Sequence, residues 1–262
     1  MSYPEPDADA IAFFQQHGYL VVRDAVPQAD LDELEARMDT IVEDPTKMKA
    51  FDWAWSADES REDRSFKIIQ AIPERAWPEI DRARFRAWAV EFGSALLGKR
   101  VEFWYGQFLA KPPGRSVPTY WHQDEGYWGR NLDDKGITCW FPLQDVDERN
   151  GCMHFVDGGH RDGVLEHTLV EGVQSDLLTC QHQVDAARAV ACPIRRGDVT
   201  FHHSATPHMT TANTGTSYRK ALTQHMQTPD AGGEGDHYPW KIWVDQRDGQ
   251  SYVPEDFGQV RR

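Results

Sequence analysis

The stretch from residue 120 to residue 128, YWHQDEGYW, places one imidazole, two acids and four aromatic side chains in nine positions. His122 and Asp124 are two positions apart, and such residues on an extended strand point to the same side. An imidazole and a carboxylate, completed by a second, distant imidazole, form the face that holds Fe(II) and leaves coordination positions open for small ligands. The stretch therefore predicts half of a metal site on one strand.

The spacing alone is weak support for a metal site. With 11 histidines and 42 acidic residues in 262 positions, roughly two pairs of the form His-x-acid are expected by chance. A second such pair, His160 and Asp162, lies in DGGHRDG, whose residues favour turns. We expect His160 to lock a loop by binding backbone groups. The aromatic neighbours of the first pair favour a dry pocket instead.

The third ligand is expected in the segment GDVTFHHSATPHMTTANTGTSYRKAL, which holds three histidines: His202, His203 and His208. A turn at residues 197–198 starts a strand on which His202 and His203 point to opposite faces. His208 follows a proline near the place where a strand would end or bend. The residues alone leave this choice open. Eleven residues after His208, Arg219 opens another predicted strand.

Bulk composition excludes several classes of protein. A formal charge of −14 opposes binding to nucleic acid or to anionic lipid. A mean hydropathy of −0.66 leaves no apolar run near the length of a membrane span. The opening MSYPEPDADA lacks the basic and apolar regions of a secretory signal, so the cytoplasm is the expected compartment. The four cysteines form no C-x-x-C pair, which argues against a zinc knuckle or a redox motif.

The pattern along the chain predicts helices first and strands second. Helical periods cover 9–17, 28–43 and 79–97, a short strand lies at 18–26, and 44–64 reads as a long loop. From about residue 100, short β-rich runs are separated by Gly, Pro, Asn and Asp clusters, which is typical of an antiparallel sandwich. We therefore predict a mainly β, α+β fold of jelly-roll type with flanking N-terminal helices.

The expected organisation is a single domain over residues 1–262. It comprises a mainly helical flank at 1–99, a jelly-roll core at 100–228 and a C-terminal loop or lid at 229–262, where glycine and turn-forming residues are frequent.

The chain resembles the phytanoyl-CoA dioxygenase (PhyH-like) family of Fe(II)- and 2-oxoglutarate-dependent oxygenases over nearly its whole length. The motifs FFQQHGYLVVRDAV, AKPPG, WHQD, ERNGCMHFVDGGHRDG and GDVTFHHSATPHMTTANTGTSYRKAL follow one another in the family's order. Their order is specific, although no single motif is. One departure is the loop before His160, where Gly159 replaces the family's usual hydroxyl residue; we interpret that loop as structural.

The resemblance implies a role for eight residues. His122, Asp124 and His208 fall on the iron ligands and form the catalytic centre. The cosubstrate 2-oxoglutarate would be held by Arg219, with Thr210 helping at the same carboxylate and with Trp140, Gln107 and Lys67 close to it. A guanidinium suits this role because it stays charged and pairs with a carboxylate through two hydrogen bonds. By position alone, Tyr127 and Trp128 follow the ligands closely and are candidates to contact the substrate, with packing in the core as the alternative.

The implied reaction couples O2 and the oxidative decarboxylation of 2-oxoglutarate to hydroxylation of an aliphatic C–H bond, with release of succinate and CO2. Related halogenases lack the ligand carboxylate, so Asp124 favours oxygenation. Desaturation, cyclisation or epoxidation at the same centre is the alternative, on an acyl-CoA or a specialised metabolite. The net charge favours a small metabolite over a CoA ester. A cupin-like isomerase or other metal-binding non-oxygenase is the rival class, which would have no need for Arg219.

Overall fold

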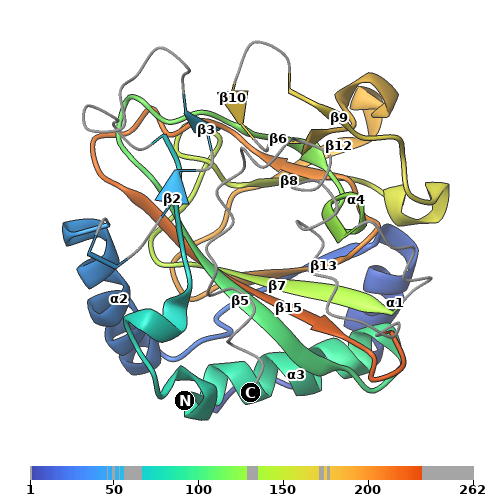
Figure 1. Ribbon diagram of the computed structural model, residues 1–262. Coiled ribbons are helices and arrows are strands. Elements are labelled where there is room, and N and C mark those ends of the chain that lie inside the picture. Colours follow the sequence, from blue (N-terminus) through green and yellow to red (C-terminus); the bar gives the residue numbers. More distant parts are fainter. Residues whose placement is uncertain are drawn as a thin grey trace.

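Two antiparallel sheets face each other in a computed structural model (Figure 1), which describes residues 2–45, 47–48, 51–52, 54–55, 67–128, 135–170, 174–175 and 178–231. The large sheet has the strand order β1-β13-β7-β15-β5-β4-β2, and the small sheet has the order β12-β8-β14-β6. The predicted jelly-roll sandwich is thereby confirmed. The structure describes only residues 229–231 of the predicted lid. Most positions of the predicted loop at 44–64 lie outside the described residues.

The strands of the large sheet are β1 (Tyr19–Val22), β2 (Phe51–Asp52), β4 (Ile69–Ala71), β5 (Glu102–Lys111), β7 (Gly136–Pro142), β13 (Val199–His203) and β15 (Arg219–Gln227). Those of the small sheet are β6 (Thr119–His122), β8 (Met153–Val156), β12 (Ala189–Cys192) and β14 (His208–Thr210). Two short ladders pair β3 (Ala54–Trp55) with β10 (Gln174–Ser175) and β9 (Thr168–Leu169) with β11 (Leu178–Thr179).

The α-helices are α1 (Ala8–His17), α2 (Gln28–Glu43), α3 (Arg84–Leu97) and the short α4 (Asp124–Trp128). Single 3-10 turns occupy η1 (Pro73–Arg75), η2 (Ile80–Arg82), η3 (Gly159–Asp162), η4 (Gln181–Gln183) and η5 (Ala186–Arg188). None of the helices in the described part of the chain is long and apolar enough to cross a membrane.

Local signals explain where the N-terminal helices begin and end. The Asp7 carboxylate accepts a hydrogen bond from the Ala10 backbone N–H at 2.8 Å and caps α1. Gly18 ends that helix with a φ of 77°, a left-handed conformation that glycine adopts without strain. The predicted start of the third helix at residue 79 is wrong. Ala83 is extended, with ψ 134°, which breaks the helical hydrogen-bond ladder, so α3 starts at Arg84.

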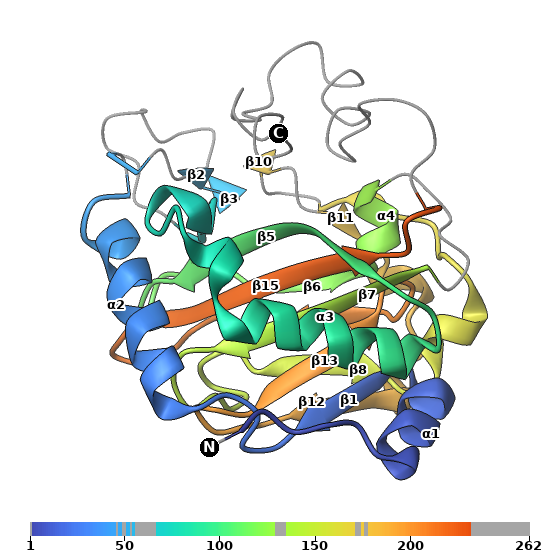
Figure 2. The same ribbon diagram turned by 90° about the horizontal axis from the view of Figure 1, so that it is seen from below.

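Helix α3 lies across one face of the large sheet (Figure 2). Its apolar stripe is buried there: Phe85, Trp88, Phe92 and Leu96. The ring of Phe92 stacks on that of Phe201 with centroids 5.1 Å apart, and Phe85 meets Phe141 edge-on at 5.5 Å. This layer forms the main hydrophobic core.

The opposite face of the large sheet lines the space between the two sheets. Side chains alternate across a strand, so Ile137, Cys139 and Phe141 of β7 join the core while Thr138 and Trp140 line a cavity. The same alternation holds on β5 and β15, where alternate residues join the core and the cavity lining. The period-two pattern therefore gives one sheet an apolar structural face and a polar face for chemistry.

Replacing Phe201 by alanine tests the packing of α3 on the sheet. Because this ring is fully buried and stacks on α3, Phe201→Ala should lower the free energy of unfolding by about 3–5 kcal/mol. Urea unfolding followed by circular dichroism measures the change. Val190→Ala on the exposed side of β12 is the control and should change stability by less than about 0.5 kcal/mol. Equal effects of the two substitutions would contradict this packing.

Candidate active site

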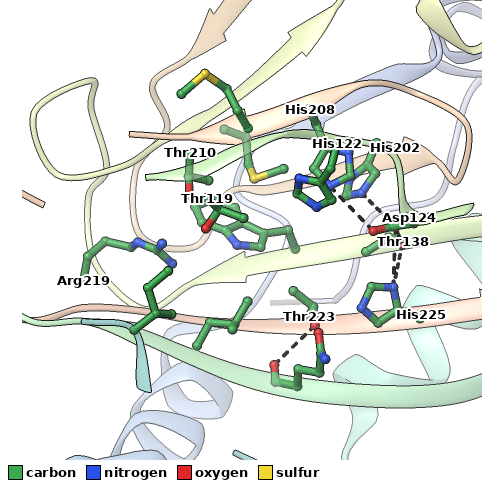
Figure 3. A pocket seen from close by; sticks show the side chains of 16 residues that line it. Thr119, His122, Asp124, Thr138, His202, His208, Thr210, Arg219, Thr223 and His225 are labelled. Carbon is green, nitrogen blue, oxygen red and sulfur yellow. Dashed lines mark hydrogen bonds and ion pairs between the residues drawn. The ribbon is translucent and has the colours of Figure 1, made fainter. Parts of the chain in front are cut away.

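Three side chains converge from two strands and one helix. His122 ends β6, His208 begins β14 directly opposite it, and Asp124 is the first residue of α4. One ligand atom of each side chain lies within 4.8 Å of the others, and all three side chains are buried. Figure 3 shows the three converging at one end of a pocket. Two imidazoles and one carboxylate in this arrangement are the donor set of a facial Fe(II) site.

The expectation that His122 and Asp124 share one extended strand is wrong. The chain leaves the strand at Gln123, whose amide nitrogen donates to the Gly163 and Ala205 carbonyl oxygens at 2.7 and 2.6 Å. These bonds to two separate loops hold a turn, after which α4 begins. The turn still brings Asp124 beside His122, so the predicted proximity results from tertiary hydrogen bonds instead of strand geometry.

Backbone carbonyls orient both ligating imidazoles. His122 Nδ1 lies 2.7 Å from the Tyr120 carbonyl oxygen, and His208 Nδ1 lies 2.9 Å from that of Thr206. A carbonyl oxygen only accepts, so each Nδ1 carries the hydrogen and each Nε2 keeps a lone pair for a metal. Burial lowers the pKa of His122 to about 4 and that of His208 well below its ordinary value. Both rings are therefore neutral, as metal binding requires.

The two oxygens of the Asp124 carboxylate have different surroundings. Oδ2 accepts a hydrogen bond from Thr138 Oγ1 at 2.5 Å and lies 3.3 Å from His202 Nε2, whereas Oδ1 lies 3.6 Å from His208 Nε2. Burial raises the pKa of Asp124, but the charge of His225 and hydrogen bonds from His202 and His225 outweigh it and hold the pKa well below its ordinary value. The carboxylate is therefore ionised, with Oδ1 directed to the ligand cluster.

A polar row across the large sheet supports this carboxylate. His202 pairs with Thr138 across β13 and β7, and Thr138 pairs with His225 across β7 and β15. Since the Thr138 hydroxyl donates its only hydrogen to Asp124, His225 Nδ1 must donate to that hydroxyl, at 2.9 Å. Sequence reasoning missed Thr138 and His225 and considered His202 only as a ligand. The available signal was strand alternation from Trp140 and Arg219, which places Thr138 and His225 toward the cavity.

At the other end of the cavity lies Arg219. The cavity, of about 80 Å³, is lined by residues that include Gln107, Trp140, Thr210 and Arg219, all predicted from the sequence (Figure 3). Arg219 is 2% exposed, and its Nε and Nη1 atoms have no hydrogen-bond partner among the described residues. Burial lowers its pKa to about 10, so it stays protonated at neutral pH. The guanidinium carbon lies 5.7 Å from the Trp140 ring centroid.

A glycine makes room for this guanidinium. Gly151 has a φ of 96°, and a Cβ there would lie 2.9 Å from the Thr211 carbonyl oxygen and 3.4 Å from Arg219 Nε. Both the backbone conformation and the close approach therefore require glycine.

Of the two candidate substrate residues, Tyr127 lies beside a metal ligand. Tyr127 packs edge-on against His122 with ring centroids 5.2 Å apart, and its hydroxyl accepts from the Leu178 N–H at 2.8 Å. Trp128 ends α4, but its side chain lies outside what the structure describes.

Lys67 is half-buried and does not line the cavity, whereas its neighbour Ile68 does. His160 is apart from the cluster, with Nε2 3.2 Å from the Gln15 carbonyl oxygen.

Fold and site together define a jelly-roll protein with a two-histidine, one-carboxylate metal centre. The chain belongs to the phytanoyl-CoA dioxygenase (PhyH) family, whose model matches residues 14–221. This match confirms the resemblance seen in the sequence motifs.

Known relatives agree with this class. The peroxisomal phytanoyl-CoA dioxygenase of Homo sapiens is 21% identical over 230 residues, which are 83% of this chain and 67% of that protein. The crystal structure of EvdO2 from Micromonospora carbonacea var. aurantiaca, complexed with 2-oxoglutarate, matches with a TM-score of 0.67 and 26% identity and covers 91% of this chain and 97% of that one.

A further solved structure shares the fold. It is the non-heme alpha ketoglutarate dependent carbocyclase SnoK from nogalamycin biosynthesis, with a TM-score of 0.67, 24% identity and 87% of each chain covered. The family and its solved neighbours indicate an oxygenase that depends on iron and 2-oxoglutarate.

The substitution His202→Phe tests the support of Asp124. Phenylalanine keeps the ring volume but removes the nitrogen that faces Oδ2, so affinity for a divalent metal should fall by about tenfold or more. Titration with Mn(II), followed by the electron paramagnetic resonance of the free ion, measures the affinity. His154→Phe, at a half-buried histidine on β8 that does not line the cavity, is the matched control. Unchanged affinity in a folded His202→Phe variant would contradict this role.

Proposed function

We propose that this protein is an Fe(II)- and 2-oxoglutarate-dependent dioxygenase that hydroxylates an aliphatic C–H bond of a small metabolite and releases succinate and CO2. The observation that carries the proposal is a single cavity with the ligand cluster of His122, Asp124 and His208 at one end and the buried guanidinium of Arg219 at the other. A metal site alone would fit many activities. The second, cationic end fits a cosubstrate that carries two carboxylates.

The donor set and the arginine fit these two groups. Neutral imidazole nitrogens and a carboxylate oxygen suit Fe(II), and three ligands on one face leave room for others. Arg219 Nε and Nη1 are hydrogen-bond donors without partners among the described residues, and a charged guanidinium pairs strongly with a carboxylate. The bound iron and 2-oxoglutarate would supply the activation of O2 and the oxidation of the substrate.

The protein's own part is to bind, to orient and to exclude water. Arg219 and Thr210 would hold the far carboxylate of 2-oxoglutarate, while the Trp140 ring flanks the guanidinium. Apolar side chains close the cavity around the reacting centre, among them Ile68, Leu109, Met153 and Met209. A dry site strengthens these electrostatic contacts and protects the oxidant from side reactions.

The substrate is expected in a second lobe that adjoins the first. This lobe, of about 70 Å³, shares His122, Asp124 and His225 with the first and adds Gln70, Tyr105 and Tyr127. The described lining of this lobe contains no lysine or arginine. A phosphate-bearing group inside it would find neither of these partners there, and burying such a group without a partner is costly. The lobe therefore favours an uncharged small metabolite over a CoA ester.

Gln70 supplies a specific contact for such a substrate. Its side chain is 1% exposed, and its amide nitrogen has no hydrogen-bond partner in the described part of the chain. A buried donor without a partner costs about 1–3 kcal/mol, which a substrate hydroxyl or carbonyl oxygen would offset. Gln70 lies on the cavity face of β4, opposite Leu109 of β5.

Two identical substitutions at buried glutamines test the role of Gln70. Gln70→Leu removes a donor without a partner and should raise the free energy of unfolding by about 1 kcal/mol. Gln123→Leu is the matched control, because its amide has three hydrogen bonds to the backbone at 2.6–2.7 Å, and it should destabilise the protein. Urea unfolding measures both. Destabilisation by both substitutions to the same extent would mean that Gln70 is satisfied without substrate.

The activity itself is tested by anaerobic addition of Fe(II) and 2-oxoglutarate. The protein should develop the weak visible charge-transfer band of the iron chelate, because three ligands on one face leave positions for the two chelating oxygens of 2-oxoglutarate. Arg219→Ala should weaken the affinity for 2-oxoglutarate by about tenfold or more and leave the affinity for Mn(II) unchanged. A wild-type protein that binds Fe(II) but shows no band would instead be a metal-binding non-oxygenase, and unchanged affinity in Arg219→Ala would remove that residue from the site.

A carbocyclase-like outcome is the second candidate, favoured by the structural similarity to SnoK. Both reactions consume O2 and 2-oxoglutarate, so succinate release does not separate them. The mass of the product does, because hydroxylation adds one oxygen atom whereas oxidative ring closure removes two hydrogen atoms.

A further inference from the structure

Two cationic side chains lie directly opposite each other inside the protein. Lys111 ends β5 and pairs with Arg219, the first residue of β15. Lys111 is 0% exposed and Arg219 is 2% exposed. Like charges at directly opposite positions of an antiparallel pair destabilise a sheet, and burial without a counter-charge adds to that cost. No carboxylate of a described residue lies within ion-pair distance of either group, so nothing in this part of the chain neutralises them.

The ammonium of Lys111 is fully occupied by neutral acceptors. Its Nζ lies 2.8 Å from the Thr210 hydroxyl oxygen, 2.8 Å from the Thr211 carbonyl oxygen and 3.2 Å from the Thr210 carbonyl oxygen. These are three acceptors for three N–H donors. Lys111 therefore has no donor left for a ligand, and any effect on a ligand must act through Thr210 or through its charge.

The contact with Lys111 determines what the Thr210 hydroxyl can do. Because that oxygen accepts from the ammonium, its single hydrogen is free to donate elsewhere. Thr210 lines the cavity together with Arg219, and Lys111 lies behind both. The hydroxyl hydrogen and the two guanidinium nitrogens without partners in the described structure, Nε and Nη1, are therefore donors available at the same end of the cavity.

We propose that Lys111 is a positioning residue of the cosubstrate site: it presents the Thr210 hydroxyl as a donor and adds a second positive charge, so that the site selects 2-oxo acids with a far carboxylate. This inference rests on the proposed binding of 2-oxoglutarate. Burial and the charge of Arg219 lower the pKa of Lys111 well below its ordinary value. An anion bound at Arg219 would stabilise the ammonium, so the ligand and the two cations support one another.

A purely structural role for Lys111, tying β5 to β14, predicts a different result. A structural tie would affect every ligand of the cavity equally, because it would act on the shape of the site. The proposed role affects only ligands with a carboxylate at the far end. Two acids separate these cases: 2-oxoglutarate, and 2-oxovalerate, which keeps the chelating 2-oxo acid but carries a methyl group in place of the far carboxylate.

The experiment measures both affinities by calorimetry on Mn(II)-loaded protein. Lys111→Met should weaken 2-oxoglutarate binding by about tenfold or more and change 2-oxovalerate binding by less than about twofold. Thr210→Val should show the same selectivity, and the double variant should lose less than the product of the two single losses because both act through one contact. Equal losses for the two acids, or unchanged 2-oxoglutarate binding, would overturn the proposal.

Two further measurements keep the outcomes distinct. Lys220→Met is the matched control, because Lys220 neighbours Arg219 but binds Glu35 and Asp39, each at 2.6 Å, outside the cavity; it should change neither affinity. Should Lys111→Met fail to fold, Lys111→Gln, which also removes the charge, takes its place in the same ratio of affinities. Wild-type protein that binds Mn(II) but neither acid would refute the proposed function, whereas wild-type binding with unselective variants would refute only the role of Lys111.

Discussion

The buried carboxylate of Asp124 is the interaction on which the rest of the site depends. Taking an ionised carboxylate out of water is expensive, and an isolated one would become protonated instead. Here Thr138, His202 and His225 form a row on three adjacent strands and face one oxygen, Oδ2. The other oxygen is left for the ligand cluster. The strand register of the large sheet therefore determines the charge and direction of a ligand carried by a different element, helix α4.

Strand alternation lets one sheet perform two tasks. Its outer face packs against α3 through aromatic rings such as Phe141 and Phe201. Its inner face carries a polar row at the metal end and a cationic pair, Lys111 and Arg219, at the far end. The length of β15 between His225 and Arg219 thus separates the two ends of the cavity. A cosubstrate with a chelating end and a carboxylate end matches this separation of charges.

Much of this arrangement is predictable from the sequence, and the remainder is not, for physical reasons. The helical stripe at Phe85 to Leu96 and the strand-rich second half follow from local periodicity. The ligand motif and Arg219 follow from family motifs. The turn at Gln123, however, depends on hydrogen bonds to Gly163 and Ala205. The sheet residues that face Asp124 and the cross-strand partner of Arg219 depend on which strands pair, and pairing between strands distant in sequence leaves no local pattern.

The carbonyl oxygens of Tyr120 and Thr206 have a consequence for metal identity. Each lies two positions before the histidine that it orients, so the tautomers of both ligands are set by their own chain segments before any ion arrives. A centre preorganised in this way binds with little ordering cost, and nitrogen and oxygen donors follow the general rank of divalent ions, with copper above nickel, cobalt, iron and manganese. Which ion occupies the centre inside a cell then depends on the supply of the ions and on the geometry and type of the ligands, and not on raw affinity alone.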